Sequence, residues 1–269
     1  MELVNTHTHT VYSGHGEGSV AELVHAASLA QISSLAITEH YILSPAFDPA
    51  GRFSIPEKSL EQYCTEILQA RELYPHMEIL LGCELDWLGS WEDRSLTQAE
   101  LGRFDVVLGS VHFLDGWVLD APSSHEGWHE RGFDAVWESY FKIWCEAVLS
   151  EMPFTIMAHP DLVKKFGYYP AFDPRKLYEQ AAEACRVAGR MVEVNTSGAL
   201  WMCREMYPSA ALLREFHKAG VPCSIGTDAH SPKDVARGID AALRLLYECG
   251  YREVTVPTKD KDRRSVTIE

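Results

Sequence analysis

The sequence predicts a parallel β/α barrel, and two observations lead to that prediction. Short apolar runs alternate with longer amphipathic ones along the chain, which is typical of repeated strand–helix units. A polar residue stands at or just after the end of each of seven apolar runs, and at six of them it is a histidine or a carboxylate. Because the carboxyl ends of parallel barrel strands meet at one mouth, we expect an active site there. The predicted strands are Leu3–Thr6, Leu35–Thr38, Glu78–Gly82, Asp105–Ser110, Thr155–Ala158, Val192–Asn195 and Cys223–Gly226.

Length and composition favour one barrel domain spanning residues 1–269. No linker, repeat or low-complexity segment interrupts the chain, and barrels of about 250 residues form single domains. The formal charge of −15 repels nucleic acid and anionic lipid, so we expect neither as a partner. No apolar run approaches the ~18 residues of a membrane span. The seven scattered cysteines contain no CxxC pair, which favours thiols in a reducing cytoplasm.

Helix starts and stops are recognisable between the strands. Ser19 with Glu22, and Ser59 with Gln62, fit capping boxes. We also expect helix starts at Asp173-Pro174 and Ser231-Pro232, helices over Asp134–Ser150, Ser209–Ala219 and Lys233–Cys249, and stops at Gly189, Gly220 and Gly250. Two irregular stretches, Tyr41–Pro56 and Leu114–Gly132, follow strands. We expect both to cover the mouth as lids or substrate walls.

Histidines gather at the predicted strand ends. His7 and His9 are two residues apart, so on an extended strand they point to the same side. Six of the 12 histidines and two carboxylates lie just beyond predicted strand ends: His7, His9, His40, Glu84, His112, His159, Asp228 and His230. This set without a thiolate suits zinc, iron or manganese, and it exceeds the needs of one tetrahedral ion. His15, in a glycine-flanked loop, is by chemistry alone as compatible with a ligand as with a solvated residue.

The motifs in order resemble the polymerase and histidinol phosphatase (PHP) superfamily over nearly the whole chain. They are His7-Thr8-His9, His15, Thr38-Glu39-His40, Gly82-Cys83-Glu84, Gly109-Ser110-Val111-His112, Ala158-His159-Pro160-Asp161 and Gly226-Thr227-Asp228-Ala229-His230. The segments Gly109–Phe113, Leu162–Gly167 and Glu193–Gly198 resemble the histidinol-phosphate phosphatase branch. The resemblance implies a distorted seven-stranded barrel with a three-metal mouth.

The resemblance also implies which residues hold each ion. His7, His9, Glu84 and Asp228 would hold the first, and Glu84 would bridge to a second ion at His112 and His159. His15, His40 and His230 would hold the third, which makes His15 an expected ligand.

Basic residues near the mouth would meet the phosphate. Lys164 or Lys165 occupies the place where the family carries a basic residue. The arginine usual after the Asn195–Gly198 motif is missing or displaced, and Arg204 is a candidate replacement. As a hypothesis, Asp228, or a water near His230, protonates the leaving group, with Glu84 bridging the ions at the reacting centre.

The resemblance implies hydrolysis of L-histidinol phosphate, a small phosphorylated substrate, in histidine biosynthesis. Other superfamily members process nucleotides and DNA, so a phosphodiesterase or exonuclease acting on a nucleotide is the alternative. A metal-storing or regulatory binding protein is a third interpretation, which the complete nine-residue ligand set disfavours. The sequence makes no prediction about the oligomeric state.

Overall fold

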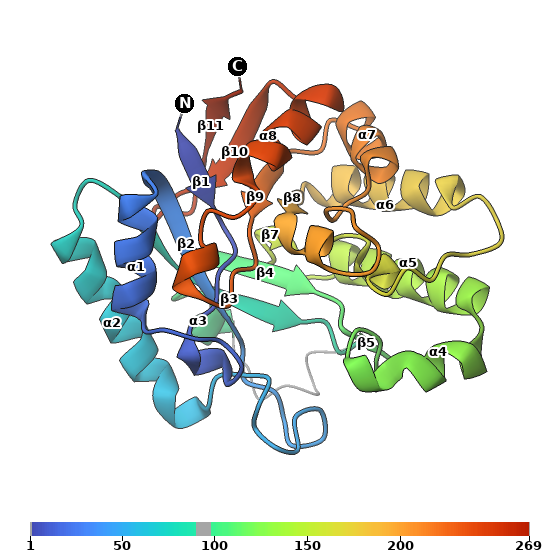
Figure 1. Cartoon of the computed structure of the whole chain (residues 1–269), viewed down its shortest axis with the longest axis horizontal. Coiled ribbons are helices and arrows are strands. Elements are labelled where there is room, and N and C mark those ends of the chain that lie inside the picture. The colour runs from blue at the N-terminus through green and yellow to red at the C-terminus, as the bar shows by residue number, and fades with distance from the viewer. Residues whose placement is uncertain (1, 90–97, 269) are drawn as a thin grey trace.

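All seven predicted strands form, and they build one parallel sheet. A computed structural model describes residues 2–89 and 98–268 of the chain (Figure 1). The strands follow one another in the order β1-β2-β3-β4-β7-β8-β9, and every pairing is parallel. Their bounds are β1 Leu3–Asn5, β2 Ile32–His40, β3 Glu78–Asp86, β4 Val106–Ser110, β7 Ile156–Met157, β8 Met191–Asn195 and β9 Cys223–Gly226.

The first and last strands meet and nearly close the sheet into a barrel. Thr6 N donates to Ile225 O at 2.8 Å, which joins the end of β1 to β9. Past the strand ends, His9 N donates to Ala229 O at 2.8 Å and Asp228 N donates to His7 O at 2.9 Å. The predicted seven-stranded barrel is therefore confirmed. Closure also brings the first predicted ligands beside the last ones, more than 200 residues away in sequence.

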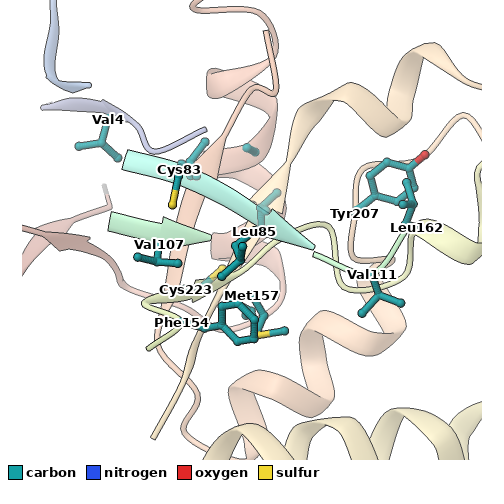
Figure 2. Packing of buried hydrophobic residues seen from close by; sticks show 14 of the residues in the cluster. Val4, Cys83, Leu85, Val107, Val111, Phe154, Met157, Leu162, Tyr207 and Cys223 are labelled. Atoms are coloured by element: carbon teal, nitrogen blue, oxygen red, sulfur yellow. The ribbon is translucent and has the colours of Figure 1, made fainter. Parts of the chain in front are cut away.

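Two apolar clusters occupy the two faces of the sheet. Residues of the inner cluster alternate along the strands with residues of the outer one, as the two-residue period of a strand requires. The inner cluster is Ala36, Leu80, Val106, Leu108, Ile156, Ala158 and Met191. Figure 2 shows members of the outer cluster, among them Cys83 and Leu85 on β3 and Val107 on β4. The inner cluster fills the barrel below its mouth. The inward positions at the C-terminal ends of the strands are therefore left to polar residues.

Helices surround the sheet and bury its outer face (Figure 1). Their bounds are α1 Val20–Leu29, α2 Leu60–Leu73, α3 Gln98–Leu101, α4 His125–Arg131, α5 Phe133–Leu149, α6 Arg175–Ala188, α7 Ala210–Lys218 and α8 Ile239–Glu248. The predicted stops are confirmed, because Gly189, Gly220 and Gly250 follow α6, α7 and α8 with φ of 66°, 73° and 108°.

One of the two predicted capping boxes forms. Ser19 Oγ accepts from Glu22 N at 3.3 Å, and Glu22 Oε2 accepts from Ser19 N at 2.8 Å. The prediction of a capping box at Ser59 and Gln62 is wrong. A 3₁₀ turn over Glu57–Ser59 runs directly into α2, and the Ser59 side chain makes no capping hydrogen bond.

The two predicted proline starts are each displaced. Helix α6 begins at Arg175, one residue after the predicted start at Pro174. Asp173 Oδ1 accepts a hydrogen bond from Arg175 N, the first helical residue, at 3.0 Å. The predicted helix over Lys233–Cys249 is wrong in its first turn. A 3₁₀ turn covers Pro232–Asp234, and α8 begins only after Gly238, whose φ of 77° interrupts a continuous helix.

The two long stretches over the mouth differ from each other. Residues 41–56 contain no helix or strand, as expected. The expectation of an irregular stretch over Leu114–Gly132 is wrong, because it contains α4 and most of a hairpin of β5 (Phe113–Leu114) and β6 (Trp117–Val118). A second hairpin, β10 (Glu253–Pro257) with β11 (Arg263–Thr267), ends the described chain. Within the described ranges no helix has the length and apolar character needed to cross a membrane.

Candidate metal centre

Strand alternation carries three predicted ligands to the barrel mouth. Ala36 on β2 and Leu80 on β3 face the interior, so positions four residues further on, His40 and Glu84, face it as well. His40 and Glu84 are also register partners across β2 and β3. His112 keeps the same alternation beyond β4, counted from Leu108. Periodicity alone therefore places these three side chains together.

Two further predicted ligands, His159 and Asp228, have a backbone φ above zero. His159 directly follows Ala158, which faces the interior, so a regular strand would direct His159 outward. Its φ of 28° turns the chain, and its Nε2 lies 3.0 Å from Glu84 Oε1. Asp228, after β9, has a φ of 51°. Non-glycine residues at positive φ cost about 1–3 kcal/mol each and cluster at functional sites.

Glu84 lies at the centre of the cluster, 1% exposed. Its two carboxylate oxygens face five imidazoles at distances that a shared set of cations would span. Oε2 lies 2.9 Å from His40 Nδ1, 3.2 Å from His7 Nε2 and 3.4 Å from His9 Nε2, and Oε1 lies 3.0 Å from His159 Nε2 and 3.7 Å from His112 Nε2. A single carboxylate thus connects predicted ligands that lie on β2 or just beyond β1, β4 and β7.

Imidazole lone pairs face one another elsewhere in the cluster. His15 Nδ1 lies 3.1 Å from Ser13 O and His230 Nδ1 lies 3.0 Å from Asp228 O, so in the neutral rings both Nδ1–H groups donate to these carbonyls. The two Nε2 atoms then present lone pairs to each other at 2.9 Å. Such lone pairs repel unless a cation lies between them. The donor set therefore fits bound metal ions.

Among the described residues, three groups have potential ligand atoms that all lie within 4.8 Å of one another, close enough to hold an ion. They are His7 with His9 and Glu84, Glu84 with His112 and His159, and His9 with His40 and His230. Asp228 Oδ1 lies 3.3 Å from His9 Nε2 and 3.7 Å from His7 Nε2. All nine residues singled out from the sequence are therefore brought together. The difference from the expected grouping is that His9, and not His15, forms the third group with His40 and His230. His15 joins the cluster through its Nε2, which lies 2.9 Å from His230 Nε2.

The surrounding imidazoles keep two carboxylates of the cluster ionised. Burial alone would raise the pKa of Glu84, but His40 and His7 hold it well below its ordinary value. Burial likewise opposes ionisation of Asp228, yet His7 and the hydrogen bond from His9 keep its pKa well below the usual range. The pKa of His9 is lowered well below normal, first by burial and then by His230. Ionised carboxylates and a neutral imidazole are the forms that bind metals.

Three buried carboxylates behind the ligands were not identified as functional from the sequence. Glu193 contacts His7 Nδ1 at 3.0 Å, and Asp86 contacts His112 Nδ1 at 2.7 Å. Glu193 begins a segment that was recognised from the sequence, and Asp86 lies two residues after Glu84 on β3. Strand alternation could therefore have placed both side chains in the barrel, although not their hydrogen-bond partners.

Glu39 is the third of these carboxylates, and it lies behind His9. Glu39 Oε2 is 3.9 Å from His9 Nδ1, and neither atom has a hydrogen-bond partner among the described residues. Burial raises the pKa of Glu39 to about 7, against hydrogen bonds from Thr10 that lower it.

The three basic residues expected to meet phosphate lie in different environments. Lys164 is 1% exposed, and its Nζ donates to Glu205 Oε2 at 3.0 Å and to Met206 O at 2.8 Å. Its ammonium group therefore links the 3₁₀ turn of Leu162–Lys164 to the segment that contains Glu205 and Met206. Lys165 Nζ donates to Asp120 Oδ2 at 2.8 Å.

Arg204 lies in an exposed turn at a φ of 53°. In the described part of the chain no ion pair or hydrogen bond joins its guanidinium to the histidine cluster.

A parallel barrel with an imidazole–carboxylate cluster at its mouth defines a class of metal-binding barrel proteins. Within that class the chain belongs to the PHP domain family, whose model matches residues 5–197. The family resemblance expected from the sequence is confirmed. A probable histidinol-phosphatase of Deinococcus radiodurans is 30% identical over 94% of this chain and 96% of that protein.

Two solved structures share the fold over most of their length. The putative histidinol phosphatase of Listeria monocytogenes superposes with a TM-score of 0.79 at 22% identity, covering 88% of this chain and 99% of that one. The histidinol phosphate phosphatase of Lactococcus lactis, complexed with zinc, L-histidinol and phosphate, gives 0.77 at 20% identity, covering 96% and 97%. At these identities the structural likeness supports the fold.

Proposed function

We propose that this chain is a metal-dependent phosphomonoesterase that hydrolyses L-histidinol phosphate to L-histidinol and phosphate. The observation that carries the proposal is the Glu84 carboxylate facing five imidazoles at the barrel mouth. The substrate is inferred from the names of the Deinococcus relative and the two structural neighbours. Histidine biosynthesis in the cytoplasm is the setting that this substrate and the cysteine usage favour.

The ligand set supports three divalent ions, for which zinc, manganese and iron are suitable candidates. We assign His7, His9, Glu84 and Asp228 to the first, Glu84, His112 and His159 to the second, and His15, His40 and His230 to the third. Bound ions of this kind acidify water and stabilise negative charge that develops on phosphoryl oxygens.

The chain's own groups orient the cluster and move the proton. Asp228 directs Oδ1 toward His9, while Oδ2 accepts from Ser197 Oγ at 3.1 Å and from Asn195 Nδ2 at 3.3 Å. These bonds fix the carboxylate at the edge of the cluster beside His230. As a hypothesis, Asp228 or a water held by His230 protonates the departing alkoxide.

Lys165 is the basic residue best placed to meet the phosphate. Its Nζ lies 4.1 Å from the centre of the Trp201 ring and is paired with Asp120. Burial alone would raise the pKa of Asp120, but Lys165 and His112 lower it. The Lys165–Asp120 pair therefore lies within electrostatic range of the metal ligands. Arg204 remains the candidate for a second contact, which would require its exposed side chain to turn toward the mouth.

A substrate comparison tests the proposal. Phosphate release should be measured for L-histidinol phosphate, nucleoside monophosphates and a single-stranded oligonucleotide, with His7→Ala as the inactive control. We expect kcat/KM for L-histidinol phosphate to exceed the other values by at least about 10²-fold. This ratio corresponds to about 3 kcal/mol of tighter transition-state binding, since each 1.4 kcal/mol gives a factor of ten. A preference for a nucleotide would contradict the proposal and favour the phosphodiesterase alternative.

A further inference from the structure

Glu193 is a fully buried carboxylate beneath the metal cluster. It lies on β8 two residues after Met191, an inner-cluster residue, so alternation directs it into the barrel. Its exposure is 0%. A buried carboxylate is tolerated only where several hydrogen bonds or charges compensate it, and the contacts of Glu193 show which groups it serves.

The contacts of Glu193 reach ligands of two different ion positions. His7 Nδ1 lies 3.0 Å from Oε1 and 3.1 Å from Oε2. The backbone N–H of His159 donates to Oε1 at 2.8 Å, and Asn195 Nδ2 donates to the same oxygen at 2.8 Å. Asn195 also donates to Asp228 Oδ2 at 3.3 Å. One carboxylate therefore joins His7 and Asp228 of the first position to His159 of the second.

Each contact fixes a property that metal binding requires. An acceptor at His7 Nδ1 keeps the proton on that nitrogen and leaves the Nε2 lone pair directed toward His9 and Glu84. The bond to His159 N holds the backbone at the residue whose positive φ turns its side chain into the barrel. Without this anchor, His159 would relax toward the outward direction of a regular strand.

We propose that Glu193 is a positioning residue that sets the affinity of the first and second ion positions together. The inference rests on the ion assignment of the proposed function. It predicts that the third position, at His15, His40 and His230, is independent of Glu193, because none of the contacts described for Glu193 reaches those side chains.

An amide cannot replace this carboxylate. In Glu193→Gln the amide oxygen can keep the bonds from His159 N and Asn195 Nδ2. The NH₂ group then occupies the Oε2 position and donates to His7 Nδ1, which moves the ring proton to Nε2. That tautomer has no lone pair on Nε2, the nitrogen that faces His9 and Glu84. Glu193→Asp keeps the charge, but its carboxylate lies one methylene further from His7. It should therefore lower the affinity for the same two ions by a smaller factor than Glu193→Gln.

The test is zinc retention in the purified protein. Wild type, Glu193→Gln and Glu193→Asp are loaded with zinc, dialysed against graded chelator concentrations and analysed for ions per chain. The matched control is Asp86→Asn, which disturbs an acid behind a single ligand, His112. Loss of a partner behind a ligand typically costs 10–100-fold in metal affinity. We expect the zinc affinity of two positions to fall by about that factor in Glu193→Gln, and that of one position in Asp86→Asn. The affinity of the third position, at His15, His40 and His230, should be unchanged in both variants.

Stability of the chelator-treated proteins separates positioning from a general structural role. The Glu193 variants should keep a cooperative thermal transition without metal. Retention of all ions at wild-type affinity, or weakening of only one ion in Glu193→Gln, would overturn the proposal. Collapse of both Glu193 variants in the metal-free state would overturn it too, because Glu193 would then act on the fold. Zinc binding without histidinol phosphate turnover in the wild type would refute the proposed function alone.

Discussion

At the scale of single residues, the space around the ligands matters as much as the ligands. Gly226 faces the barrel interior next to Glu193 and His7. A Cβ at this position would collide with Glu193 Oε2 and lie 2.6 Å from His7 Cβ. The absence of a side chain at Gly226 thus makes room for the acid behind His7, a proposed ligand of the first ion.

Gly226→Ala should therefore lower zinc affinity by about 10–100-fold, the usual effect of displacing an outer partner of a ligand. Chelator competition measures it. The matched control is Gly109→Ala, whose methyl would meet the Phe154 ring at 2.6 Å on the outer face of the sheet. That control should lower the melting temperature without weakening zinc, and equal zinc affinity in both variants would contradict this account.

Sequence reasoning found the residues at the strand ends because a parallel barrel brings them to one mouth whatever the register. It missed the roles of Glu193 and Asp86, since identifying their partners requires knowing which atoms of His7 and His112 they meet. It also could not tell Lys164 from Lys165. The partners of Lys164, Glu205 and Met206, come from a loop some 40 residues away.

At the scale of elements, the two serines proposed as caps offer a matched pair. Ser19 caps α1 through a complete box, whereas Ser59 makes no capping bond at α2. Ser19→Ala should lower the free energy of unfolding by about 1 kcal/mol, and Ser59→Ala should change it by a few tenths at most. Urea denaturation of the metal-loaded proteins compares them. Equal losses would show that the structural difference between the caps has no energetic consequence.

Element types were predictable where one local signal dominated, as at the alternating strands and the glycine stops. The errors arose where a second signal overrode the first. Ser231-Pro232 has the composition of a helix start, but Gly238 adopts a left-handed conformation and delays α8. The short helix α4 escaped notice because seven residues carry too little periodicity to distinguish a helix from a loop.

At the scale of the whole molecule, closure of the barrel between β1 and β9 makes the site. Ions bound across strands from both ends of the chain should stabilise the folded state, because the unfolded chain has no such site. An ion at 1,000 times its Kd contributes about 4 kcal/mol. Chelation at pH 8 should therefore lower the melting temperature by about 8 °C or more, at ~2 °C per kcal/mol.

The difference in melting temperature between the metal-loaded and the metal-free protein should grow with pH. Burial alone would lower the pKa of His112, but Asp86 raises it from 6.5 to about 10 in the metal-free protein. A group with a raised pKa stabilises the fold below its unfolded pKa and loses that contribution as pH rises toward 10. Ion binding has the opposite trend, since protons compete with metal for imidazole. Melting temperatures with and without chelator between pH 6 and 9 measure the difference, and a constant one would contradict the assignment of His112 as a ligand.

The most direct test of the central claim is phosphate release from L-histidinol phosphate as zinc or manganese is added back to metal-free protein. The account predicts no turnover without metal and full activity only as the ion content approaches three per chain. His7→Ala should stay at least about 10²-fold less active at every ion content, because it lacks a ligand of the first ion. Full activity of the wild-type protein with one ion or none would contradict the account.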